Sequence, residues 1–159
     1  MSAVNPNFVN KARGNGSAVG SRVARGIALK NNSARKLLRS RGATKQQARE
    51  TVASFDGQIY ANKGRAGESF TITETSLGSA SGLYVTRGSA GKTPASRIQN
   101  LALPSSNKAL IESNAFLTRP QILLEGRVHS QIGNPGFGST AKGGGQQVIT
   151  DAFNGGLRR

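Results

Sequence analysis

Helix and strand patterns are segregated along this chain, and that order constrains the fold most. The clearest helix begins after Thr44, which forms a capping box with Gln47, and its apolar face carries Ala48, Val52 and Phe55. Beyond this helix the apolar residues alternate with polar ones in several short stretches. Short helices followed by short strands favour an α+β fold, in which basic N-terminal helices precede a small, mostly antiparallel β-sheet.

The remaining elements follow from local signals. A short helix capped by Ser33 is expected before the first one, and it carries Leu37 and Leu38. A third helix begins at Thr93 and Pro94, since threonine suits the N-cap and proline suits the first helical position. Strands are expected at residues 58–61, 69–74, 83–87, 121–124, 127–132 and 146–150, and residues 109–116 fit a helix or a strand.

Composition excludes several classes of protein. The 159 residues suit one domain with a tail, and only 35% of them are hydrophobic, so the core must be small. The absence of cysteine excludes a disulfide scaffold, a thiol nucleophile and a cysteine-based zinc site, and a single histidine excludes a multi-histidine metal site. No apolar run approaches the roughly 20 residues of a membrane-spanning helix.

Positive charge is concentrated at one end of the chain. The net charge is +15, yet residues 1–49 hold 11 basic residues and no acidic one. We therefore predict a basic linker or arm with a short helix at residues 1–42 and a compact α+β domain at residues 43–159. The arm would serve for binding RNA, for entry into a cell, or as the surface that an acidic partner protein neutralises.

One polar strand suggests metal-independent RNA cleavage. With a period of two, Glu125, Arg127 and His129 project from the same face. A carboxylate and an imidazole can exchange the protons of the reaction, and an arginine can neutralise phosphate charge. The alternative is a solvated outer face of an antiparallel sheet, which shows the same alternation.

A second group of residues suggests binding of a nucleotide. Three consecutive glycines allow close approach of a ligand to the backbone, and amides at the start of the next strand can hold ribose hydroxyls or water. Two arginines could clamp a diphosphate, although surface arginines are common. The candidates are Gly143, Gly144, Gly145, Gln146, Gln147, Arg87 and Arg97.

Three segments in a fixed order resemble the tuberculosis necrotizing toxin family of NAD glycohydrolases. They are TPASRIQNLALPSS (93–106), QILLEGRVHSQ (121–131) and GFGSTAKGGGQQ (136–147). The resemblance covers about 55 residues, and it departs from the family pattern at His129 and Ser130, which replace Ala-Pro. The family's upstream Asp-Arg-(Phe/Ile)-Gly motif has no match, so Arg87 or Arg65 would have to supply the second substrate arginine.

The resemblance implies hydrolysis of NAD+ to ADP-ribose and nicotinamide, with NAD+ as substrate and no metal or cofactor. It implies Gln147 as the catalytic residue and Arg97 on the diphosphate. It also implies the C-terminal effector of a bacterial polymorphic or contact-dependent toxin, delivered by secretion or from the cell surface into the cytoplasm of a competitor. An acidic cognate immunity protein would then be a partner. The residue patterns leave two alternatives: a tRNase toxin using Glu125, Arg127 and His129, and a non-enzymatic basic module that binds nucleic acid or protein.

Overall fold

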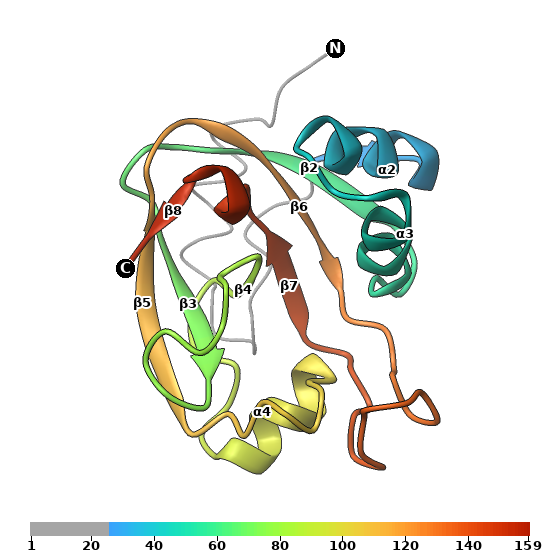
Figure 1. Ribbon diagram of the computed structural model, residues 1–159, viewed down its shortest axis with the longest axis vertical. Helices are drawn as coiled ribbons and strands as arrows, with labels where there is room; N and C mark the ends of the chain where they lie inside the picture. The colour runs from blue at the N-terminus through green and yellow to red at the C-terminus, as the bar shows by residue number, and fades with distance from the viewer. Residues whose placement is uncertain (1–25) are drawn as a thin grey trace.

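The computed structural model describes residues 26–159, which form three α-helices, one short 3-10 helix and eight strands (Figure 1). The helices are α2 (Asn31–Ser40), α3 (Lys45–Ala53), α4 (Pro94–Leu101) and the 3-10 helix η1 (Ala152–Asn154). The strands are β1 (Ile27–Leu29), β2 (Ile59–Gly64), β3 (Ser69–Glu74), β4 (Tyr84–Val85), β5 (Ile111–Leu117), β6 (Gln121–Arg127), β7 (Gln146–Ile149) and β8 (Leu157–Arg158). No helix in this part of the chain is long and apolar enough to cross a membrane.

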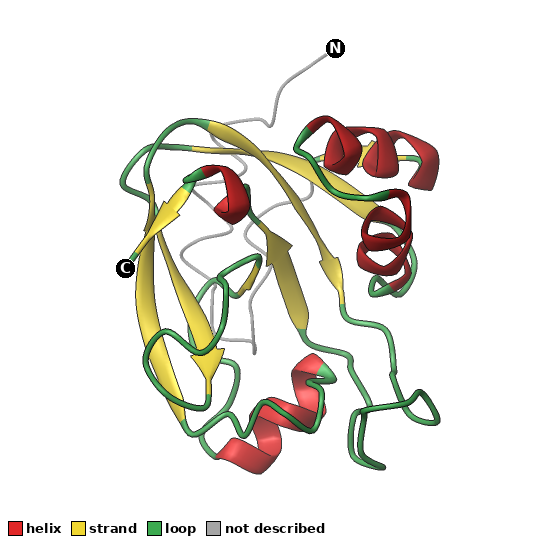
Figure 2. Cartoon of the chain, in the orientation of Figure 1, coloured by secondary structure: helices red, strands yellow, loops and turns green. Residues whose placement is uncertain are grey.

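The strands form two antiparallel sheets, which confirms the predicted α+β class (Figure 2). The larger sheet has the order β1-β2-β6-β7-β4, and the smaller one has the order β3-β5-β8. A backbone bridge between Thr71 and Thr86 joins β3 to the end of β4. The two sheets therefore meet beside β4, the edge strand of the larger sheet.

Both faces of the larger sheet are covered. Helices α2 and α3 cover one face, where Leu38 and Val52 pack with Ile59, Leu124 and Ile149. The smaller sheet covers the other face, and its core side chains include Phe70 and Leu117, which pack with Leu123 and Val148. Because both faces are covered at the middle of β6, even the charged side chain of Glu125 is buried there.

The local signals predicted most elements. The capping box of Thr44 and Gln47 is present, with hydrogen bonds of 3.1 and 2.9 Å, and Thr93 caps α4 with Pro94 inside its first turn. Ser33 does not cap α2, since the N-cap is Lys30. The ambiguous residues 109–116 contain strand β5. The two strands predicted at 121–124 and 127–132 are one strand, β6, which ends at Arg127.

The predicted division between residues 42 and 43 does not separate two bodies in the described residues. Strand β1 pairs with β2, and Ala34 and Leu38 of α2 are buried in the core. Residues 26–42 are thus part of the same folded unit as the rest. Residues 1–25 of the linker or arm predicted at 1–42 lie outside the described residues.

A buried carboxylate makes the fold sensitive to acid. Burial alone would raise the pKa of Glu74, but hydrogen bonds from Ser113, the Ala80 amide and Arg159 hold that pKa below its ordinary value. A carboxylate with a lowered pKa in the folded state stabilises the protein above its unfolded-state pKa of about 4.3, and this contribution is lost as the pH falls through the folded-state value.

We therefore expect Glu74→Gln to lower the free energy of unfolding at pH 7, and the difference from the wild type to shrink at pH 3. Urea unfolding at the two pH values measures both differences. An equal deficit at pH 7 and pH 3 would show that the charge of Glu74 does not contribute.

Candidate functional site

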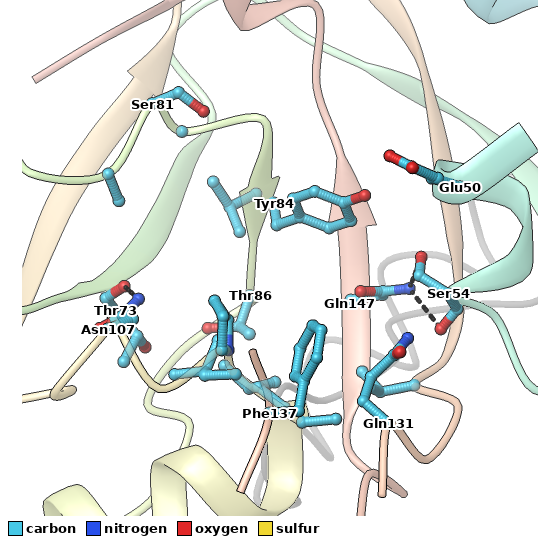
Figure 3. A pocket seen from close by; sticks show the side chains of 18 of the residues that line it. Glu50, Ser54, Thr73, Ser81, Tyr84, Thr86, Asn107, Gln131, Phe137 and Gln147 are labelled. Atoms are coloured by element: carbon cyan, nitrogen blue, oxygen red, sulfur yellow. Dashed lines mark hydrogen bonds between the residues drawn. The ribbon is translucent and has the colours of Figure 1, made fainter. Parts of the chain in front are cut away.

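A cleft of about 630 Å³ lies at the open edge of the larger sheet (Figure 3). Its walls come from the end of α3, from β3 and β4, from the end of α4 and from the loop after β6. The volume is in the range of sites for small organic ligands, which is about 300–1,000 Å³. A second cavity next to it has a volume of about 200 Å³.

The shortness of β4 opens this cleft. Strand β4 pairs with β7 only at Ile149 and Val148, whereas β6 pairs with β7 as far as Gln146. Among residues 26–159, the β7 edge at Gln146 and Gln147 therefore has no neighbouring strand on the β4 side. Because successive side chains of a strand point to opposite faces, Gln147 shares the helix-facing side with Ile149.

Gln147 enters the cleft with a fixed orientation. It is 5% exposed, and its Nε2 donates hydrogen bonds to the backbone O of Ser54 at 3.1 Å and to Oγ of Ser54 at 2.9 Å. The Ser54 hydroxyl in turn donates to the Thr51 carbonyl at 2.6 Å. Figure 3 shows the amide oxygen of Gln147 turned away from Ser54. The amide is thus held by its nitrogen, and its oxygen is left to accept a hydrogen bond from a ligand.

Part of the wall of the cleft is apolar. Ala102, Val128 and Ala141 form a small buried cluster against which Leu101 and Phe137 pack, and all of these except Ala141 line the cleft. A backbone bridge between Pro104 and Phe137 holds the end of α4 against the loop after β6. A flat apolar ring could lie against Phe137 while its polar attachment reaches the amide of Gln147.

Two further candidate residues of the site could not be recognised from the sequence. Glu50 and Tyr84 line the cleft, and Figure 3 shows both on the side of Gln147. Glu50 lies on the exposed surface of α3 and Tyr84 on β4, and the Tyr84 hydroxyl donates to Oγ1 of Thr51 at 3.3 Å. No motif marks either residue, since they meet only when α3 packs beside the sheet edge.

Arg87 does not line the cleft and lies instead between two carboxylates. Its Nε donates to Glu125 at 2.9 Å, its Nη1 donates to Glu68 at 2.8 Å, and its guanidinium stacks on the ring of Phe70. Burial opposes its charge, but Glu125 and Glu68 raise the pKa of Arg87 above its ordinary value. The guanidinium is therefore held in the interior and not in the cleft, where the predicted contact with a diphosphate would place it.

Arg97 is also occupied by the fold. Its Nε donates to the Gly91 carbonyl at 2.9 Å, its Nη1 donates to the Ala109 carbonyl at 2.8 Å, and Glu112 lies 3.6 Å away. It ties α4 to the segment before β5, and it is absent from the lining of the cleft. The structure therefore does not bring Arg97 together with Gln147 in the cleft, and its contact with a diphosphate stays a prediction. The alternative Arg65 does not line the cleft either.

The three glycines bind backbone rather than a ligand. Their amides donate to carbonyls at 2.8–2.9 Å, namely Gly143 to Gln99, Gly144 to Val128 and Gly145 to Asn100. The amide groups expected to receive an anion are thus used to fasten the loop to α4 and to the chain after β6. Glycine is needed because a Cβ at position 143 would lie 2.6 Å from the Val128 oxygen.

We expect Gly143→Ala to lower the free energy of unfolding by about 1–3 kcal/mol, since the residue has a φ of +77° as well as this close contact. Gly138→Ala is the matched control, because a Cβ there meets nothing within 4 Å and its φ is ordinary. The control should stay within about 0.5 kcal/mol of the wild type in urea unfolding. Equal stability of the two variants would contradict the packing role of Gly143.

The side chain of Gln146 does not face the cleft as that of Gln147 does. It points to the opposite face of β7, toward the smaller sheet, and its Oε1 is buried without a hydrogen-bond partner among the described residues. It is absent from the lining of the cleft. Of the two neighbouring amides proposed from sequence, only Gln147 therefore faces the cleft.

The residues proposed for RNA cleavage are not assembled into a site. Glu125 is fully buried with Arg87 beneath the smaller sheet. Arg127 lies in solvent beside Asp56 at 3.5 Å, and His129 lies beyond the strand end with its Nδ1 2.7 Å from the Ser130 carbonyl. The smaller sheet covers this face of β6 at Glu125, whereas Arg127 at the end of the strand and His129 beyond it are exposed.

Comparison with known proteins supports the fold. No protein-family model matches the chain, and no curated protein sequence matches it. Among solved structures, a chain from the structure of Tse6 in complex with Tsi6 aligns with a TM-score of 0.56 and 13% sequence identity. The alignment covers 80% of this chain and 91% of that chain, and a likeness at this identity shows a shared fold.

Proposed function

We propose that this domain is a bacterial toxin effector that hydrolyses NAD+ to ADP-ribose and nicotinamide in the cleft beside Gln147. The observation that carries the proposal is the amide of Gln147, which is fixed by Ser54 with its oxygen free for a ligand. The sequence resemblance assigns a catalytic role to this same glutamine. The apolar wall at Phe137 and Val128 suits the nicotinamide ring, and the polar wall suits the ribose.

The reaction breaks the bond between C1′ of the ribose and the nicotinamide nitrogen. Nicotinamide leaves as a neutral molecule with the bonding electron pair, the oxygen of water bonds to C1′, and one proton of that water passes to solvent. Oε1 of Gln147 would accept a hydrogen bond from a ribose hydroxyl or from the attacking water, which fixes their geometry as positive charge develops on the ribose. Because Ser54 and Thr51 already hold the amide, no reorganisation is needed.

Glu50 would stabilise the positive charge that develops on the ribose. It is the carboxylate among the residues that line the cleft, and it is exposed, so water screens it. We expect Glu50→Gln to lower kcat about fivefold to tenfold with little change in KM, and the difference to shrink as salt is added. Steady-state kinetics at low and high salt measure this. A larger effect on KM than on kcat would contradict the assignment.

The proposed toxin function also implies a partner protein that neutralises it. The structural neighbour Tse6 is in complex with a second protein, Tsi6, so a domain of this fold can be bound by a partner. We propose that an acidic immunity protein binds this chain in the producing cell, because residues 30–49 include seven basic residues and no acidic one. The effector would act in the cytoplasm of a competitor cell.

The proposal is tested by incubating the purified chain separately with NAD+ and with total tRNA. We expect release of nicotinamide from NAD+ and no fragmentation of the tRNA. Intact NAD+ after long incubation with excess protein would rule the proposal out. Cleavage of tRNA would favour a ribonuclease, with a site other than the separated Glu125 and His129.

A further inference from the structure

A second, smaller cavity adjoins the main cleft. It has a volume of about 200 Å³ and shares Glu50 and Tyr84 with the main cleft, so these two side chains form a common wall. The volume is below the range of about 300–1,000 Å³ for a whole small ligand, and it suits one part of a ligand. A dinucleotide bound beside Gln147 has a second half that must lie next to the cleft.

An exposed aromatic ring stands at this cavity. Phe153 of η1 lines it and is 69% exposed. Tyr84, which is 42% exposed, lines the cavity from β4. Exposed aromatic rings of this kind serve as platforms on which nucleobases stack.

A cation with an unused donor lies in the same cavity. Arg41 lines it, its side chain is 14% exposed, and its Nη1 is buried without a hydrogen-bond partner among the described residues. Its Nη2 donates to the Ile122 carbonyl, which fixes the guanidinium. The nearby carboxylate of Asp151 is 4.0 Å from Nε of Arg41 and is paired more closely with Arg119, at 2.6 Å. Nη1 is therefore a donor that the described residues leave unsatisfied.

We propose that this cavity binds the adenosine monophosphate half of NAD+, with the adenine stacked on Phe153 and Nη1 of Arg41 donating to the phosphate. The identity of the ligand rests on the proposed function, whereas the site itself rests on the cavity, the exposed ring and the unused donor. Tyr84 and Glu50 then separate the adenine half from the ribose that reacts beside Gln147. The two cavities together would favour a dinucleotide over a single nicotinamide nucleotide.

The test uses the two halves of the substrate as separate probes. AMP and nicotinamide mononucleotide are each titrated into the wild type, into Phe153→Ala and into Leu77→Ala, and calorimetry measures the affinities. Leu77 is the matched control, since it is 74% exposed and lines neither cavity. We expect Phe153→Ala to weaken AMP about 5- to 150-fold and to leave nicotinamide mononucleotide unchanged. Adenosine, which lacks the phosphate, should bind the wild type more weakly than AMP.

The outcomes separate this inference from the proposed function. Equal AMP affinity in the wild type and in Phe153→Ala, or no AMP binding at millimolar concentration, overturns the adenine site even if NAD+ is hydrolysed. Equal weakening of AMP by Leu77→Ala overturns it as well. AMP binding that depends on Phe153, in a chain that leaves NAD+ intact, supports a nucleotide site and rejects only the hydrolysis.

Discussion

Replacing Gln147 by alanine should lower the rate of NAD+ hydrolysis about 100- to 1,000-fold, which is the cost of removing a positioned polar group from a transition state. The amide nitrogen is held by Ser54, so the oxygen is already in place when charge develops on the ribose. We expect the loss in kcat with little change in KM, because the interaction strengthens in the transition state. Nicotinamide release under steady-state conditions measures both constants.

The neighbouring Gln146→Ala variant is the control. It removes the same side chain from the same strand, but from the face that does not line the cleft. We expect it to hydrolyse NAD+ at close to the wild-type rate. Equal loss of activity in both variants would mean that the effect comes from damage to β7 and not from the amide of Gln147.

Replacing Arg87 by methionine should lower the free energy of unfolding by about 3–5 kcal/mol. The substitution leaves the buried carboxylates of Glu125 and Glu68 without their shared cation, and an uncompensated buried charge is costly. Adding Glu125→Gln to Arg87→Met should recover part of the loss, because it removes one of the two charges. Urea unfolding monitored by circular dichroism measures the three variants.

Arg127, an exposed arginine that also faces a carboxylate, is the control for Arg87. Its carboxylate partner is Asp56, at 3.5 Å, and 61% of its side chain is exposed. Arg127→Met should therefore change the free energy of unfolding by less than about 1 kcal/mol. If Arg87→Met unfolded like the wild type but lost NAD+ binding, Arg87 would be a substrate residue after all.

The helix starts that depend on hydrogen bonds between residues close in sequence could be predicted from the sequence. The caps at Thr44 and Thr93 depend on hydrogen bonds within three residues, so the sequence alone located the starts of α3 and α4. Helix α2 begins at Asn31, after Lys30, without a side-chain cap, because its stability comes from the burial of Ala34 and Leu38. Its start therefore could not be read from a capping residue.

The burial and the partners of the polar and charged candidate residues depend on contacts between segments that are distant in sequence. The alternation along β6 correctly put Glu125 on the side opposite Leu124, yet it could not show that the smaller sheet covers that side. Arg87 meets Glu125 across 38 positions of the chain, and Gln147 meets Ser54 across 93. Such pairings arise from the packing of sheets and helices, so they require the folded structure.

The role proposed for Gln147 is tested most directly by an NMR titration of the wild-type chain with an NAD+ analogue that is not hydrolysed. In this analogue a carbon replaces the ring oxygen of the nicotinamide ribose. The side-chain amide signals of Gln147 are assigned by their absence in Gln147→Ala. We predict that these signals shift on binding while those of Gln146 stay in place. Saturable binding that leaves the Gln147 signals unchanged, or no binding at millimolar analogue, would contradict the account.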